Sequence, residues 1–60
     1  MKVYVVIEYE GAGDGKVRQR RVVSVHGDAW AAATTCSELA GDAHDRGMDR
    51  IYDFEGMEVQ

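Results

Sequence analysis

The sequence predicts an α+β fold: a two-layer sandwich in which one helix covers one face of an antiparallel sheet, in the order ββαβ. Residues 3–9 alternate with the period of two that is typical of a strand. A glycine-rich segment then separates them from a second β-branched stretch, and an alanine-rich run follows Asp28. We expect three strands, or four if the end of the chain adds a short one.

The first two strands form a hairpin in this prediction. Alternate residues from Val3 to Tyr9 are apolar, and Val17–Val25 again carries β-branched residues at alternate positions. Between them, Gly11–Gly15 contains the glycines that a tight loop with positive φ requires. A loop centred on residues 12–14 predicts these cross-strand neighbours: Glu10 with Lys16, Glu8 with Arg18, and Val3 with Val23.

A helix is expected to begin after Asp28, whose carboxylate can accept hydrogen bonds from the free amides of a first turn at Ala29. We expect it to end near Arg46, because the interior Gly41 costs only about 1 kcal/mol. Apolar residues at steps of three and four predict a narrow stripe that packs on the sheet: Ala29, Ala32, Cys36, Leu39, Ala40 and Ala43.

Residues 50–59 predict the third strand. Ile51 lies on the opposite face from Tyr52 and Phe54, which favours a bulge near Gly56. The helix leaves one face of the sheet uncovered, and a partly apolar open face favours a dimer or a partner. We expect that face to carry Tyr4, Val6 and Val22 beside Lys2, Glu8 and Arg18.

The chain length limits the function classes. A chain of 60 residues holds one domain, residues 1–60, and its thin core favours pairing with another chain. One cysteine, Cys36, excludes an internal disulfide, and no zinc-site spacing accompanies it. The apolar run Val3–Ile7 is too short for a signal-peptide core or a membrane helix. We therefore expect a cytoplasmic protein.

We do not expect any segment of this sequence to serve as a catalytic or cofactor-binding motif. Gly11, Gly13 and Gly15 have the spacing of a phosphate loop, but a strand follows them where a helix N-terminus is needed. Cys36 lies on the apolar stripe of the helix, and no orienting group accompanies it or the histidines. We predict no enzyme activity, no metal and no cofactor.

Acidic residues dominate the end of the chain from residue 42 onward, although the net charge of the whole chain is only −4. Solvated carboxylates keep small proteins soluble, and that is the simplest interpretation. The functional interpretation is a surface that binds a basic groove on a protein partner, with Tyr52 as an aromatic anchor. The acidic candidates are Asp42, Asp45, Asp49, Asp53, Glu55 and Glu58.

A basic run on the second strand, Lys16, Arg18 and Arg20, offers an alternative surface that could follow a phosphate backbone. The net negative charge of the chain would repel nucleic acid at long range. Direct nucleic-acid binding is therefore the less favoured prediction.

With its opening strand Met-Lys-Val-Tyr-Val-Val-Ile, its acidic end and its plan of strands and helix, the chain resembles the small phage-encoded anti-CRISPR proteins. The nearest resemblance is to inhibitors of type I effector complexes. It implies a non-enzymatic inhibitor in the cytoplasm of a bacterial host. The acidic surface would mimic DNA and occupy the basic DNA-binding groove of an effector subunit.

The alternative is a small phage or bacterial accessory domain that acts by homodimerisation or as a subunit, with charges that only maintain solubility. A contiguous acidic ridge favours DNA mimicry. Scattered acidic residues together with a hydrophobic face that a dimer can bury favour the accessory domain.

Overall fold

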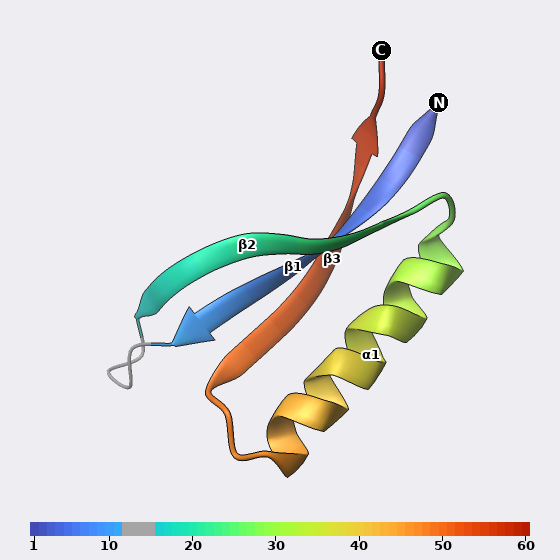
Figure 1. Cartoon of the computed structure of the whole chain (residues 1–60). Coiled ribbons are helices and arrows are strands. Elements are labelled where there is room, and N and C mark those ends of the chain that lie inside the picture. The colour runs from blue at the N-terminus through green and yellow to red at the C-terminus, as the bar shows by residue number, and fades with distance from the viewer. Residues whose placement is uncertain (12–15) are drawn as a thin grey trace.

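The computed structural model describes residues 1–11 and 16–60, so the predicted loop residues 12–15 lie outside the described residues. The elements are β1 (Lys2–Gly11), β2 (Val17–His26), α1 (Ala29–Asp45) and β3 (Arg50–Glu58) (Figure 1). The three strands form one antiparallel sheet in the order β2-β1-β3, with β1 in the centre. The predicted α+β fold and its ββαβ order are confirmed.

Local sequence sets both ends of α1. Asp28 has extended backbone angles, and its Oδ1 accepts a 2.9 Å hydrogen bond from the amide of Ala31, as predicted for the N-cap. At the other end Arg46 is the C-cap and Gly47 follows with φ 69°. The amide of Gly47 donates to His44 and the amide of Met48 to Ala43, which together make a Schellman motif. The predicted end near Arg46 is confirmed.

The predicted register of the hairpin is wrong. Glu8 opposes Arg21, not Arg18, and Glu10 opposes Gln19, not Lys16. The pairing of β1 with β2 shifts register at two places, between Val6 and Ile7 and between Glu10 and Gly11. Val23 lies at the first shift and therefore has no paired partner. Pairing ends at Gly11 and Val17, so the connection is longer than predicted, and each shift turns part of β2 to the other face.

The bulge expected near Gly56 is also absent, because β1 and β3 pair without interruption from Lys2↔Glu58 to Glu10↔Arg50. Ile51 and Tyr52 point to opposite faces because successive side chains of a regular strand alternate between the two faces. Each face of β3 carries both apolar and charged residues. The irregularities of the described strands therefore lie in β2, the strand farthest from β3.

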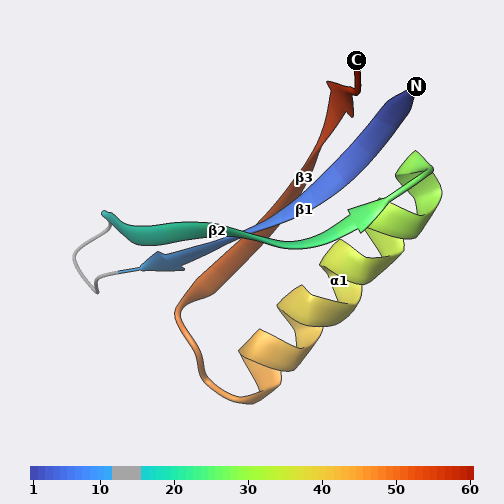
Figure 2. The same ribbon diagram turned by 45° about the horizontal axis from the view of Figure 1, so that its top comes forward.

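The helix lies along one face of the twisted sheet, closest to β3 (Figures 1 and 2). Along β3, Tyr52 and Phe54 are half-buried, whereas Ile51, Asp53 and Glu55 are exposed. This alternation identifies the face of Tyr52 and Phe54 as the one that α1 covers. Their partners on β1 are Glu8 and Val6, and both are buried.

The two faces of β1 are therefore the reverse of those that the sequence predicted. Val6 and Glu8, expected on the open side, lie on the covered side, whereas Val22 lies on the open side, as expected, because it opposes Ile7. The open face, as used below, carries the odd-numbered residues of β1 and their cross-strand partners.

The core is small. Its buried hydrophobic residues are Val5, Val6, Ile7, Ala32 and Ala43. Within the predicted helix stripe, Cys36 and Leu39 are half-buried, but Ala29 and Ala40 are exposed.

Candidate functional site

Large apolar side chains gather on the open face of the sheet. Val25 opposes Val5, Val22 opposes Ile7, Ile51 opposes Tyr9 and Met57 opposes Val3, so all eight share one side. The outer members remain exposed: Val22 53%, Val25 59%, Ile51 66% and Met57 49%. Asp53 and Glu55 lie between Ile51 and Met57 on the same face of β3 and are exposed. The face is therefore an apolar surface, interrupted by charged side chains, that is open to solvent.

An ion pair crosses this surface. Nη2 of Arg20 lies 3.6 Å from Oε1 of Glu55, and both side chains are about half exposed. Arg20 opposes Tyr9, and its guanidinium lies 5.9 Å from the centre of the Tyr9 ring. Glu55 opposes Val5, so the pair spans the sheet across Ile7, which helps to explain why Ile7 is 1% exposed on the side without a helix.

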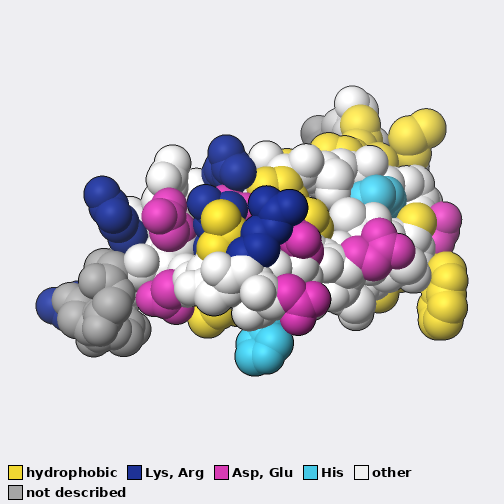
Figure 3. Space-filling model, turned by 60° about the horizontal axis from the view of Figure 1, so that its bottom comes forward, with side chains coloured by type: hydrophobic (Ala, Val, Ile, Leu, Met, Phe, Trp, Pro, Cys, Tyr) yellow, Lys and Arg dark blue, Asp and Glu magenta, His cyan; other side chains and the backbone are white. Residues whose placement is uncertain are grey.

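The acidic residues predicted to form one partner-binding surface are distributed over several elements. Asp42 and Asp45 lie on α1, Asp49 lies in the connection to β3, and Asp53, Glu55 and Glu58 lie along β3. Figure 3 shows Asp and Glu side chains interspersed with Lys and Arg side chains over the side of the molecule that it displays. That side has no unbroken acidic ridge.

Several of these carboxylates have nearby partners within the chain. Asp42 lies 3.3 Å from Arg46, and Glu58 lies 3.8 Å from the N-terminal amino group. Oδ1 of Asp53 accepts a 2.8 Å hydrogen bond from the amide of Phe54. These exposed interactions are weak, but they reduce the net negative field that an acidic surface would present.

Tyr52, predicted as an exposed aromatic anchor, is half-buried on the covered face. Its hydroxyl donates a 2.7 Å hydrogen bond to Oε2 of Glu8, which raises the pKa of Tyr52. Oε1 of Glu8 accepts a 2.9 Å hydrogen bond from Nε of Arg21, and Arg50 lies 3.9 Å from the same carboxylate. The geometry gives Tyr52 a structural partner inside the domain.

The basic candidates do not form one row either. Arg20 lies on the open face with Glu55, and the next residue, Arg21, points to the covered face and pairs with Glu8. Arg18 lies at the register shift between Gln19 and Val17. Lys16 precedes β2 and is exposed. The bulge therefore breaks the alternation on which the predicted basic face depended.

Neither the thiol nor the acidic groups form a recognisable reaction centre in the part of the chain that the structure describes. Burial, and to a smaller extent the charge of Asp53, raise the pKa of Cys36, which keeps the thiol protonated near neutral pH. Among residues 1–11 and 16–60, no three His, Cys, Asp or Glu side chains are grouped to hold a metal ion. Over the same residues, no helix is long and apolar enough to cross a membrane.

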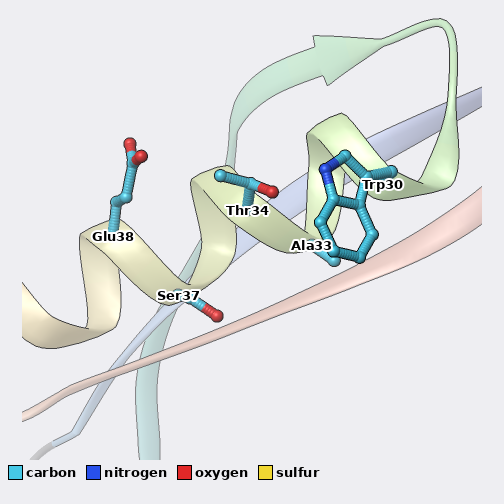
Figure 4. Close-up of a pocket in the computed structure, with 5 residues that line it drawn as sticks. All are labelled: Trp30, Ala33, Thr34, Ser37 and Glu38. Carbon is cyan, nitrogen blue, oxygen red and sulfur yellow. The ribbon is translucent and has the colours of Figure 1, made fainter.

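Two shallow hollows mark the surface. One, of about 310 Å³, lies on the outer side of α1 between Trp30 and Glu38 (Figure 4). Trp30 itself is 82% exposed there. The second, of about 100 Å³, lies at the end of the open face, where Ile51 and Tyr9 meet Asp49. The second hollow is also lined by Lys16, but it is far smaller than the roughly 300–1,000 Å³ of a typical small-molecule site.

The sequence predicted an open sheet face that could bind a partner, but it assigned the wrong β1 residues to that face. Alternation along residues 50–57 places Ile51 and Met57 together, but their apolar neighbours on β2 follow only from the register. Comparisons with protein-family models, with curated proteins and with solved structures find no match for this chain.

Proposed function

We propose that this chain is a non-enzymatic accessory domain that binds protein through the open face of its sheet. The observation that carries the proposal is the set of large apolar side chains exposed on this one face, Val22, Val25, Ile51 and Met57. A soluble domain gains nothing by exposing large apolar side chains together, and such surfaces are typical of interaction sites.

The composition of the surface favours a protein partner. It combines exposed apolar side chains with three charged groups of both signs, Arg20, Glu55 and Asp53. Protein interfaces likewise combine apolar contacts with polar and charged groups. Nucleic acid is a poorer fit, because Arg20 is already beside a carboxylate and the chain carries a net charge of −4.

DNA mimicry by an inhibitor of a type I effector complex has less support from the geometry. It needs adjacent carboxylates free to contact a basic groove, whereas Glu55 pairs with Arg20 and Asp42 with Arg46. It stays a prediction with its own test. Replacing Asp49, Asp53 and Glu55 together by alanine should abolish binding to such a complex and its salt dependence if mimicry operates.

A site-specific crosslink tests the proposed surface. A photoreactive amino acid is placed at Ile51, which is 66% exposed on the open face, and at Ala40 as a control exposed on α1. Each variant is irradiated in cells that produce it, and the products are identified by mass spectrometry. We expect a defined protein adduct from position 51 that position 40 does not give.

A second variant provides specificity. Val22→Asp adds a charge to the open face at a position that is 53% exposed, so it should remove the adduct from position 51 without unfolding the domain. Circular dichroism checks the fold of each variant. Equal labelling from positions 40 and 51, or labelling that ignores Val22→Asp, would contradict the proposal.

A further inference from the structure

The molecule exposes more area than a folded monomer of its mass is expected to expose. The chain exposes 4404 Å². A folded monomer of 6.6 kDa is expected to expose roughly 3,900 Å², so the excess is about 500 Å². A standard interface removes about 800 Å² from each partner, so this excess is a large part of one such contribution. The Cα extents of 38 × 21 × 13 Å describe a thin domain that a second layer would thicken.

The charges on the open face select among possible occupants. Arg20 and Glu55 carry opposite charges, and their side chains are 52% and 54% exposed. In a symmetric dimer, residue i of one copy faces residue j of the other, and the reverse contact follows. Arg20 of one copy can therefore face a carboxylate of the other copy, and the reverse contact follows from the symmetry. Asp53, which is exposed on the same face, adds a second carboxylate to each copy.

We infer that a second copy of this chain covers the open face, so that two sheets pack face to face in a symmetric homodimer. The inference rests on the proposed function and names the partner. Val22, Val25, Ile51 and Met57 of both copies supply the apolar contacts of the interface. Arg20 of each copy lies within reach of Glu55 of the other, in addition to the contact within its own chain.

Sedimentation equilibrium over a range of concentrations is the first test. The wild-type protein is expected to show a monomer–dimer equilibrium. Ile51→Asp adds a charge that the dimer would bury, and it should raise the dissociation constant at least about tenfold. Ala40→Asp, an equally charged change on exposed α1, should leave that constant unchanged. A wild-type protein that stays monomeric at every concentration would overturn the inference.

Charge exchange between copies gives a second test that does not depend on stability. Arg20→Glu makes positions 20 and 55 both acidic, and Glu55→Arg makes them both basic, so each variant alone loses the pair within the chain. Each variant is expected to dimerise more weakly than the wild type. Mixing the two restores both contacts only between different chains, so the mixture should form heterodimers more tightly than either variant self-associates.

The mixing result identifies the interface directly. Loss of the intrachain contact is the same before and after mixing, so any gain must arise between copies. A mixture that associates no better than its components would show that Arg20 and Glu55 do not face each other across a dimer, and would overturn this arrangement.

The crosslink at position 51 separates failure of the dimer from failure of the proposed function. An adduct with a different protein, together with a monomeric wild type, would retain the open face as a binding surface and reject the second copy. No adduct and no dimer would reject both.

Discussion

The hydroxyl of Tyr52 on β3 donates a 2.7 Å hydrogen bond to Oε2 of Glu8 on β1, and these residues are 44 positions apart in the sequence. Arg21 of β2 donates to the other carboxylate oxygen at 2.9 Å. One buried carboxylate on the central strand therefore joins all three strands. Glu8 is 6% exposed, so its charge is acceptable there only because these donors surround it.

We predict that Glu8→Gln destabilises the domain by about 1–3 kcal/mol at pH 7. An amide at this position loses the charge that Arg21 and Arg50 contact, and it turns an NH₂ group toward at least one donor. Urea unfolding measures the change. Tyr52→Phe is the milder comparison, because it removes one donor but keeps the carboxylate with its arginines. Equal stability of Glu8→Gln and wild type would contradict the structural role.

The same carboxylate should make stability depend on acid. The hydrogen bond from Tyr52, followed by the contacts with Arg21 and Arg50, lowers the pKa of Glu8, although burial alone would raise it. A lowered pKa in the folded state stabilises the protein above the ordinary glutamate pKa of about 4.3, and this stability is lost as pH falls through the folded value.

Urea unfolding between pH 7 and pH 3 checks this dependence. The stability difference between wild type and Glu8→Gln should be largest at neutral pH and should shrink below a pH of about 4.3. A difference that stays constant over this range would mean that the titration of Glu8 does not contribute.

The sequence predicted the elements and the ends of the helix because those features depend on neighbouring residues. Asp28 caps α1, and Gly47 ends it with φ 69°, both within a few residues of the turns that they control. A regular period of two likewise predicted β1.

The sequence could not give the faces, because a one-residue shift exchanges them. The shift at Val6/Ile7 places Val22 opposite Ile7, and no local signal in residues 17–26 marks that position. The contact between Glu8 and Tyr52 is equally invisible to local reasoning, since it joins residues far apart in the chain. The predicted site residues were chosen by charge, whereas the proposed surface depends on how three strands are paired.

Two glycines of the helix region should respond in opposite directions to alanine. Gly41 lies inside α1, and an added Cβ would meet nothing within 4 Å, so Gly41→Ala should stabilise the domain by about 0.5–1 kcal/mol. Gly47 has equally open surroundings but φ +69°, so Gly47→Ala should destabilise it by about 1 kcal/mol. Thermal unfolding of both variants measures the contrast. The same sign for both would refute the assignment of the helix end.

The N-cap of α1 should contribute a measurable part of the stability. Asp28→Ala removes the oxygen that accepts from Ala31 at 2.9 Å and should cost about 1 kcal/mol. Asp28→Asn retains an acceptor at the same place and should cost much less. Thermal unfolding of the two variants separates loss of the hydrogen bond from loss of the charge, and equal losses would assign the effect to charge.

Cys36 should react slowly in the folded protein. Burial, followed by the negative charge of Asp53, raises the pKa of its thiol above the ordinary value of about 8.5, and the thiolate is the reactive form. At pH 7.5 we expect an aromatic disulfide reagent to label it at least about tenfold more slowly than in urea-unfolded protein. Asp53→Asn removes the charge but not the burial, so it should recover only a small part of the lost rate. Identical rates in folded and unfolded protein would show that α1 does not shield the thiol.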